Sequence, residues 1–200
     1  LGLTEQLEQL FKSEGVKFVV YDETVANPTT QNVEEALMLY KENECQAIIA
    51  FGGGSAMDAA KATGARIARP NKTLAKMKGI LKVRKKLPLL IAVPTTAGTG
   101  SETTLAAVIT DSQTRHKYAI NDFPLIPRYA LLLPQLTIGL PPMLTATTGM
   151  DALTHAVEAF IGNSTTKKTR KEAIWAVDII FKFLPIAYSE PQNIEARTKM

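Results

Sequence analysis

The sequence lacks a second cysteine, histidines beyond two, and any long apolar run. Cys45 is the only cysteine among the 200 residues, which excludes an internal disulfide and fits a reducing compartment, so we expect a cytoplasmic protein. His116 and His155 are the only histidines. No apolar run approaches the roughly 20 residues of a membrane span, and Leu1 to Leu10 shows neither an initiator Met nor a signal-peptide pattern. We therefore expect no membrane partner.

A strong charge of one sign is also missing. The 23 basic and 19 acidic residues leave a formal charge of +4, and most of the excess lies in two short runs, Lys76 to Lys86 and Lys167 to Lys171. Neither run is interleaved with aromatic residues, as a nucleic-acid groove would be. Both runs are typical of solvated surface, and we expect no nucleic-acid partner.

Helical and strand patterns alternate along the first two thirds of the chain. Short continuous apolar runs followed by turn residues are typical of strands buried on both faces of a parallel sheet. The predicted elements are helix Thr4–Ser13, strand Val16–Tyr21, helix Val33–Asn43 with a capping-box-like start at Asn32 and Glu35, strand Ala47–Phe51, helix Ala56–Ala68 and strand Leu89–Val93. This order predicts an α/β fold built from right-handed crossovers.

The remaining segments predict a change of architecture. Arg69 to Pro88 is polar and basic and is interpreted as a surface excursion. Short strands are expected at 104–110, 117–120 and 129–133, with a hairpin at Asp111-Ser112, and helices at 148–160 and 169–184. We place a domain boundary near Leu140, which gives an α/β domain over 1–140 and the start of an all-helical domain over 141–200. Sixty residues with two or three helices offer little core of their own.

A glycine-rich turn joins a predicted strand to a predicted helix at Gly52 to Ser55. Backbone N–H groups and the helix dipole attract phosphate there, and the absence of Cβ atoms lets a pyrophosphate approach. The pattern is not G-x-G-x-x-G, and a plain tight turn is the alternative. Asp58 and Lys61 follow in the same helix, where the alternative is that they are ordinary exposed residues.

Polar residues also follow the second buried strand, from Thr95 to Glu102. At the carboxyl end of a parallel sheet, hydroxyls and N–H groups would line the crevice in which doubly wound folds hold ligands. The alternative is a polar loop with a helix cap.

Asp151 and His155 lie four residues apart in a predicted helix, with Glu158 on the same face. The spacing places the carboxylate and the imidazole side by side, as two ligands of one metal ion would be. A buried histidine with a carboxylate partner is the alternative.

Three motifs in register now point to a family. GGGSAMDAAK at Gly52 to Lys61, PTTAGTGSE at Pro94 to Glu102 and GLPPMLTATTGMDALTHAVEAF at Gly139 to Phe160 closely resemble the metal-dependent, iron-type (group III) alcohol dehydrogenases. Members of this family also form the alcohol dehydrogenase part of aldehyde-alcohol dehydrogenases. The resemblance implies a Rossmann-like, dehydroquinate synthase-like domain followed by a helical domain, with NAD(P) and a divalent metal, Fe2+ or Zn2+, meeting between them.

The resemblance also implies roles for particular residues. Asp151 and His155 would be metal ligands and the catalytic centre. The implied cofactor-binding residues are Asn27, Gly53, Gly54, Ser55, Asp58, Thr95, Thr96, Thr99, Thr104 and Lys117. The implied partners are a small alcohol or aldehyde and further copies of the chain, as a homodimer or higher homo-oligomer.

The sequence departs from the family pattern in three places. Two further histidine ligands are expected from later helices, and His116 lies on a predicted strand in the other domain, where we interpret it as a surface residue. The family's first strand is missing before Leu1, and Leu133 stands where an Asp is usual. We interpret the chain as truncated at both ends, with the 200-residue segment alone inactive.

The implied reaction is hydride transfer between NAD(P) and a primary alcohol or aldehyde, with the metal activating the substrate oxygen. The alternatives are a glycerol dehydrogenase or a dehydroquinate synthase-like enzyme of the same fold, and an inactive nucleotide-binding fragment.

Overall fold

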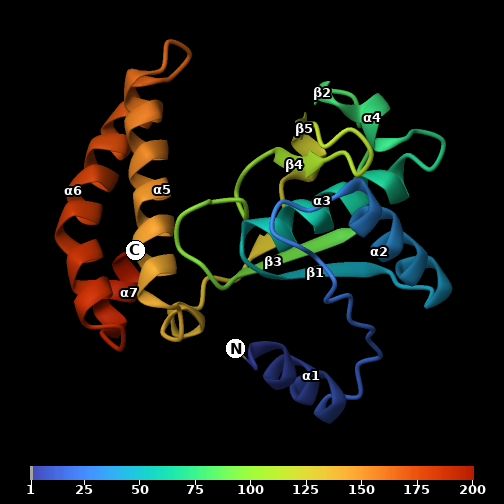
Figure 1. The fold of residues 1–200 in the computed structure, drawn as a ribbon, viewed down its shortest axis with the longest axis horizontal. Helices are drawn as coiled ribbons and strands as arrows, with labels where there is room; N and C mark the ends of the chain where they lie inside the picture. Colours follow the sequence, from blue (N-terminus) through green and yellow to red (C-terminus); the bar gives the residue numbers. More distant parts are fainter. Residues whose placement is uncertain (1) are drawn as a thin grey trace. The chain divides into compact units, whose positions relative to one another are not determined.

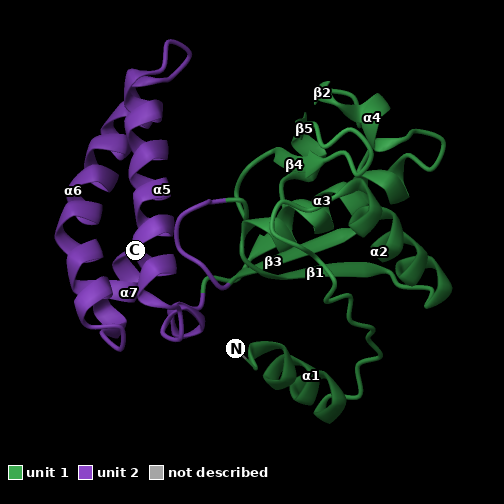
Figure 2. Cartoon of the chain, in the orientation of Figure 1, with its two compact units in different colours: residues 1–94, 101–132 green, residues 95–100, 133–200 purple. Residues whose placement is uncertain are grey.

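The computed structural model describes residues 2–200, which divide into two compact units (Figure 2). The α/β unit comprises Leu1–Pro94 and Ser101–Leu132, and the helical unit comprises Thr95–Gly100 and Leu133–Met200. The short segment that follows the second buried strand thus groups with the helices.

The larger sheet of the α/β unit is parallel, in the order β1-β3-β6. Its strands are β1 (Ala47–Gly52), β3 (Leu89–Pro94) and the short β6 (Tyr129–Ala130). The register pairs Gly52 with Pro94, so the two strands end side by side. The two strands predicted at 47–51 and 89–93 are confirmed, but β1 is only partly buried, since Ile49 is 39% exposed. The third strand is shorter than predicted, and the 3-10 helix η2 (Pro134–Thr137) follows it.

Helices cover this sheet (Figure 1). α3 (Gly54–Ala68) starts directly after β1, and its Met57 packs in one apolar cluster with Ala50 and Leu90 of the strands. The helix α2 (Thr30–Glu42) begins three residues earlier than predicted. Its capping box is formed by Thr29 and Asn32, because the side chain of each receives a hydrogen bond from the backbone N–H of the other. The prediction that Asn32 and Glu35 form the box was therefore wrong.

A second, smaller sheet has the order β2-β5-β4. It consists of β2 (Gly79–Ile80), β5 (Lys117–Asn121) and β4 (Ala106–Thr110). β4 and β5 pair antiparallel, with Thr110 opposite Lys117, which confirms the predicted hairpin. The 3-10 helix η1 (Phe123–Leu125) follows β5.

Two further predictions for the α/β unit were wrong. No ladder forms at Val16–Tyr21, which lies in the uncoiled segment between α1 (Leu3–Ser13) and α2 (Figure 1); alternating apolar residues make a strand only where another strand pairs with them. Arg69 to Pro88 is more than a surface excursion. It contains α4 (Leu74–Met77), and its sparse apolar residues enter the main core: Leu74, Met77, Val83 and Leu87.

The helical unit contains η2, α5 (Pro142–Ile161), α6 (Lys167–Ser189) and α7 (Ile194–Lys199). α5 and α6 form a helical hairpin around a five-residue connection. Gly149 lets them approach closely, since a Cβ there would lie 2.3 Å from Leu184 Cδ1. Large apolar side chains nevertheless stay exposed, among them Trp175 and Phe181, while Phe183, Ala187 and Ala196 form a small buried cluster.

Over residues 2–200, no helix combines the length and the apolar character that crossing a bilayer requires.

Candidate nucleotide and metal site

The glycine turn has the backbone geometry that its sequence requires. Gly52 adopts φ +148°, and a Cβ at this position would lie 2.9 Å from Ala56 Cβ. Gly53 is the N-cap of α3 and caps it with no side chain. The first N–H groups of an α-helix have no partner within the helix, so this 15-residue helix directs its positive end at the turn. These features suit a phosphate group.

Two residues from distant segments converge on this turn. Asn27, which adopts φ +58°, donates its backbone N–H to Ser55 Oγ at 3.2 Å. Lys117 Nζ in turn donates to Asn27 Oδ1 at 2.8 Å. All three are predicted cofactor-binding residues, and the structure brings them into one chain of hydrogen bonds beside Gly53 and Gly54. We name Asn27, Ser55 and Lys117 the turn cluster.

Further along α3, a lysine is completely buried. Lys61 has an exposed fraction of 0%, and its Nζ donates to Ser101 Oγ at 3.2 Å, to Thr104 O and Oγ1 at 2.8 and 3.0 Å, and to Ala106 O at 3.0 Å. The interpretation of Lys61 as an exposed helix residue is therefore wrong. Thr104, another predicted cofactor-binding residue, is held by this ammonium group.

Asp58 joins the same network. Ser101 Oγ donates to Asp58 Oδ1 at 2.8 Å, and the Val108 backbone N–H donates to Oδ2 at 3.1 Å, so both carboxylate oxygens of this half-buried residue have protein partners. Burial raises the pKa of Asp58 and lowers the pKa of Lys61 to about 8. Ser101 links the two opposite charges. We name Asp58, Lys61, Ser101 and Thr104 the lysine cluster.

Sequence reasoning missed the roles of Lys61 and Ser101. A signal was present, since Asp58 and Lys61 are three residues apart and therefore share a face of an alanine-rich helix. Because an alanine-rich helix is usually packed against other elements, two charged residues on one of its faces indicate buried hydrogen-bond partners for them.

The threonine-rich loop lies against α5 in the helical unit. A Cβ at Gly98 would lie 2.2 Å from the backbone oxygen of Thr148 and 2.7 Å from its carbonyl carbon. Only glycine permits this approach. Thr95, Thr96 and Thr99, the remaining predicted cofactor-binding residues, are half-buried around it.

The predicted metal ligands face one another on α5. His155 Nε2 lies 3.8 Å from Asp151 Oδ1, and their side chains are 49% and 45% exposed. The alternative of a buried histidine with a carboxylate partner is therefore wrong. Within residues 2–200, no group of three or more His, Cys, Asp or Glu side chains is placed to hold a metal. His116 is exposed, with its Nε2 3.1 Å from Lys78 Nζ, as predicted.

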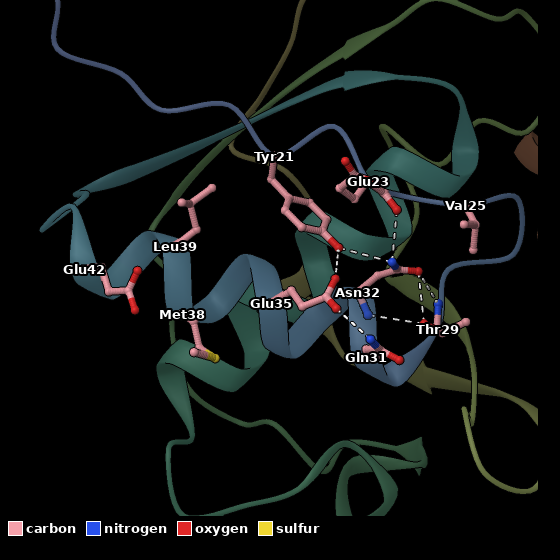
Figure 3. A pocket seen from close by; sticks show the side chains of 10 residues that line it. All are labelled: Tyr21, Glu23, Val25, Thr29, Gln31, Asn32, Glu35, Met38, Leu39 and Glu42. Carbon is pink, nitrogen blue, oxygen red and sulfur yellow. Dashed lines mark hydrogen bonds between the residues drawn. The ribbon is translucent and has the colours of Figure 1, made fainter.

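A groove of about 810 Å³ lies elsewhere in the α/β unit, between α2 and the segment before it (Figure 3). Its polar atoms bind one another: Tyr21 Oη donates to Glu35 Oε2 at 2.6 Å, and Asn32 Nδ2 donates to Tyr21 Oη at 3.1 Å. Burial and the bond to Glu35 raise the pKa of Tyr21 to about 12. None of the predicted site residues lines this groove.

A parallel sheet whose glycine turn leads directly into a helix, followed by a helical unit, defines an α/β protein with a helical extension. Comparison with known proteins gives the family. The family model of the iron-containing alcohol dehydrogenases matches residues 1–134, and that of the family's C-terminal domain matches residues 145–200. The chain belongs to the iron-containing alcohol dehydrogenase family.

Relatives agree over the whole chain. It is 37% identical to an NAD-dependent methanol dehydrogenase from Bacillus methanolicus over 199 residues, covering 100% of this chain and 52% of the relative. It is 41% identical to the probable alcohol dehydrogenase EutG of Salmonella typhimurium, covering 100% and 50%. The solved alcohol dehydrogenase from Oenococcus oeni superposes with a TM-score of 0.95 at 38% identity, covering 99% and 51%. The chain thus spans about half the length of these relatives.

Proposed function

We propose that the full-length protein carrying this sequence is an alcohol dehydrogenase that transfers a hydride between NAD and a small primary alcohol or aldehyde, using a divalent metal. The observation that carries the proposal is the turn cluster, where Asn27, Ser55 and Lys117 meet at the glycine turn. Family membership supports the alcohol chemistry, and a relative's name supports NAD.

The residues of the α/β unit supply nucleotide binding. The N–H groups at the start of α3 and its dipole would hold the pyrophosphate, and the Lys117 ammonium adds positive charge beside them. Asn27 orders the turn cluster through its backbone and side chain. β1 and β3 end in register at Gly52 and Pro94, so the glycine turn lies at the edge of the sheet where parallel α/β folds bind nucleotides.

The donor chemistry of Asp151 and His155 fits Fe2+ or Zn2+. A carboxylate oxygen and an imidazole nitrogen are accepted by both ions at about 2.0–2.2 Å, so two donors 3.8 Å apart can share one ion. When bound, the metal would supply Lewis acidity that eases deprotonation of an alcohol, and NAD would supply the hydride chemistry. The two side chains would hold the ion at a fixed position on α5.

The finer assignments belong to the same proposal. We favour NAD over NADP and iron over zinc, because a relative is NAD-dependent and the family is iron-containing. Cys45 is free, which is consistent with the reducing cytoplasm. A homo-oligomer and a division of roles between a nucleotide-binding part, residues 1–140, and a metal-binding part, from residue 141, are proposals as well.

The test is an activity assay on the full-length protein. NADH oxidation with short aldehydes should appear after Fe2+ is added, with metal analysis showing iron bound in proportion to activity. The absence of metal-dependent turnover with any short aldehyde, in a protein that is folded and binds NADH, would reject the dehydrogenase.

A second candidate is an inactive nucleotide-binding protein. It is favoured by one observation, namely that the contacts of the turn cluster are complete without a metal ion. NADH binding without metal binding or turnover would select this candidate.

A further inference from the structure

The lysine cluster closes an open strand edge. β4 is an edge strand of the small sheet, and such a strand exposes unpaired backbone groups. Here α3 pairs two of them: Lys61 Nζ donates to Ala106 O, and Asp58 Oδ2 accepts from Val108 N–H. These two hydrogen bonds to the edge of β4 are a structural reason for the burial of Lys61 and Asp58.

Lys61 makes more contacts than closing the edge requires. Three of its four hydrogen bonds go to the segment before β4, where Ser101 Oγ, Thr104 O and Thr104 Oγ1 all accept from the same ammonium. Thr104 Oγ1 is also 3.5 Å from Ser101 O, to which it donates. A single buried cation thus gathers residues 101–106, a segment without regular structure at its start.

The same helix that carries Lys61 begins at the glycine turn. α3 is rigid between Gly54 and Lys61, so the ammonium fixes Ser101 and Thr104 at a constant place relative to the N–H groups of the turn. We propose that Lys61 is a positioning residue for nucleotide binding, which acts by holding Thr104 in place rather than by touching the nucleotide. The inference rests on the proposed function, since it takes Thr104 and the turn as parts of one nucleotide site.

The charge state of Lys61 should therefore matter. An ammonium has three N–H donors for its four acceptors, whereas the neutral amine has two. Burial lowers the pKa of Lys61 to about 8, although the nearby charges of Asp58 and Glu102 raise it. The charge of Lys117 in turn lowers the pKa of Asp58. The affinity for the nucleotide should fall as the pH rises past about 8 and Lys61 loses its proton. This part of the pH dependence should be absent from the Lys61→Met protein.

The experiment measures the dissociation constant of NADH in the full-length protein by nucleotide fluorescence, together with thermal unfolding. Lys61→Met, of similar length but without donors, should raise the dissociation constant at least tenfold. Ser101→Ala, which removes one acceptor and the link to Asp58, should raise it about three- to tenfold, the value of one hydrogen bond. If Lys61→Met fails to fold, Ser101→Ala decides.

Two control variants separate positioning from stability. Ser112→Ala removes a comparable hydroxyl, bonded to Thr30 and the Gln31 N–H at the start of α2, and Leu74→Ala weakens the main core. Both should bind NADH like wild type, well below their unfolding temperatures. Equal loss of affinity in the controls, or wild-type affinity in Ser101→Ala and in a folded Lys61→Met, would overturn the inference.

Failure of the proposed function would show differently. If the wild-type protein itself bound no NADH, the nucleotide site would be rejected. Hydrogen exchange then still tests whether the lysine cluster holds residues 101–106 in place. The amides of these residues should exchange faster in Ser101→Ala than in Ser112→Ala, and equal rates would reject this role of the cluster.

Discussion

Gly98 offers the sharpest test of how the threonine loop is held. A Cβ at this position would lie 2.2 Å from the Thr148 backbone oxygen, more than about 1 Å inside ordinary contact distance. The obstacle is helix backbone in the middle of α5, which cannot rotate away as a side chain can. Gly98→Ala should therefore push the loop off the helix, at a cost of about 1–3 kcal/mol from overpacking.

The displacement should also reach the proposed site. Thr96 and Thr99 flank Gly98 closely, and a shift of about 1 Å in positioning groups can cost about a hundredfold in rate. The assay compares the unfolding temperature and the NADH-dependent turnover of full-length Gly98→Ala with those of Gly139→Ala. A Cβ at Gly139 would meet no atom within 4 Å, so the same substitution should be nearly neutral there.

The result that would refute this reasoning is specific. If Gly98→Ala matched Gly139→Ala in both unfolding temperature and turnover, the loop would not be seated against α5 as described, and the threonines could not depend on that contact.

Three further predictions concern other sites. His155→Ala should abolish metal-dependent turnover but leave NADH affinity and unfolding nearly unchanged, because its side chain is half exposed; titration with Fe2+ and NADH checks this. Thr145→Val should lower the unfolding free energy in urea by about 1–3 kcal/mol, because it removes the acceptor of the buried Arg197 Nη1, 2.9 Å away. Lys61 has a folded pKa of about 8 below its usual 10.5, so between these values the unfolded chain holds more protons. The unfolding free energy of wild type relative to Lys61→Met should therefore rise with pH across that window.

The parts of the fold that the sequence predicts well are those decided by local pattern. The apolar runs at Ala47–Phe51 and Leu89–Val93 form neighbouring parallel strands as predicted, although only the second is largely buried. The hairpin at Asp111 follows from its turn residues, since Asp111 Oδ1 accepts from two backbone N–H groups of the turn, those of Gln113 and Thr114.

The features that could not be predicted depend on partners far along the chain. Val16–Tyr21 has a strand's composition, but a strand also needs a neighbour, and composition does not supply one. Lys61 is charged and so was taken as exposed; its burial depends on four acceptors some 40 residues later. The spacing of Asp151 and His155 predicted their proximity but not how exposed they are.

The pairing of Gly52 with Pro94 constrains how this protein can change in length. Each residue of a strand advances the chain by about 3.3 Å, and successive side chains point to opposite faces of the sheet. A one-residue insertion or deletion within β1 or β3 would shift the end of that strand by about 3.3 Å relative to the end of the other. It would also move the buried side chains beyond the change to the opposite face of the sheet. Length variation should accumulate instead at the exposed positions near Lys85, where added residues leave the ends of both strands aligned.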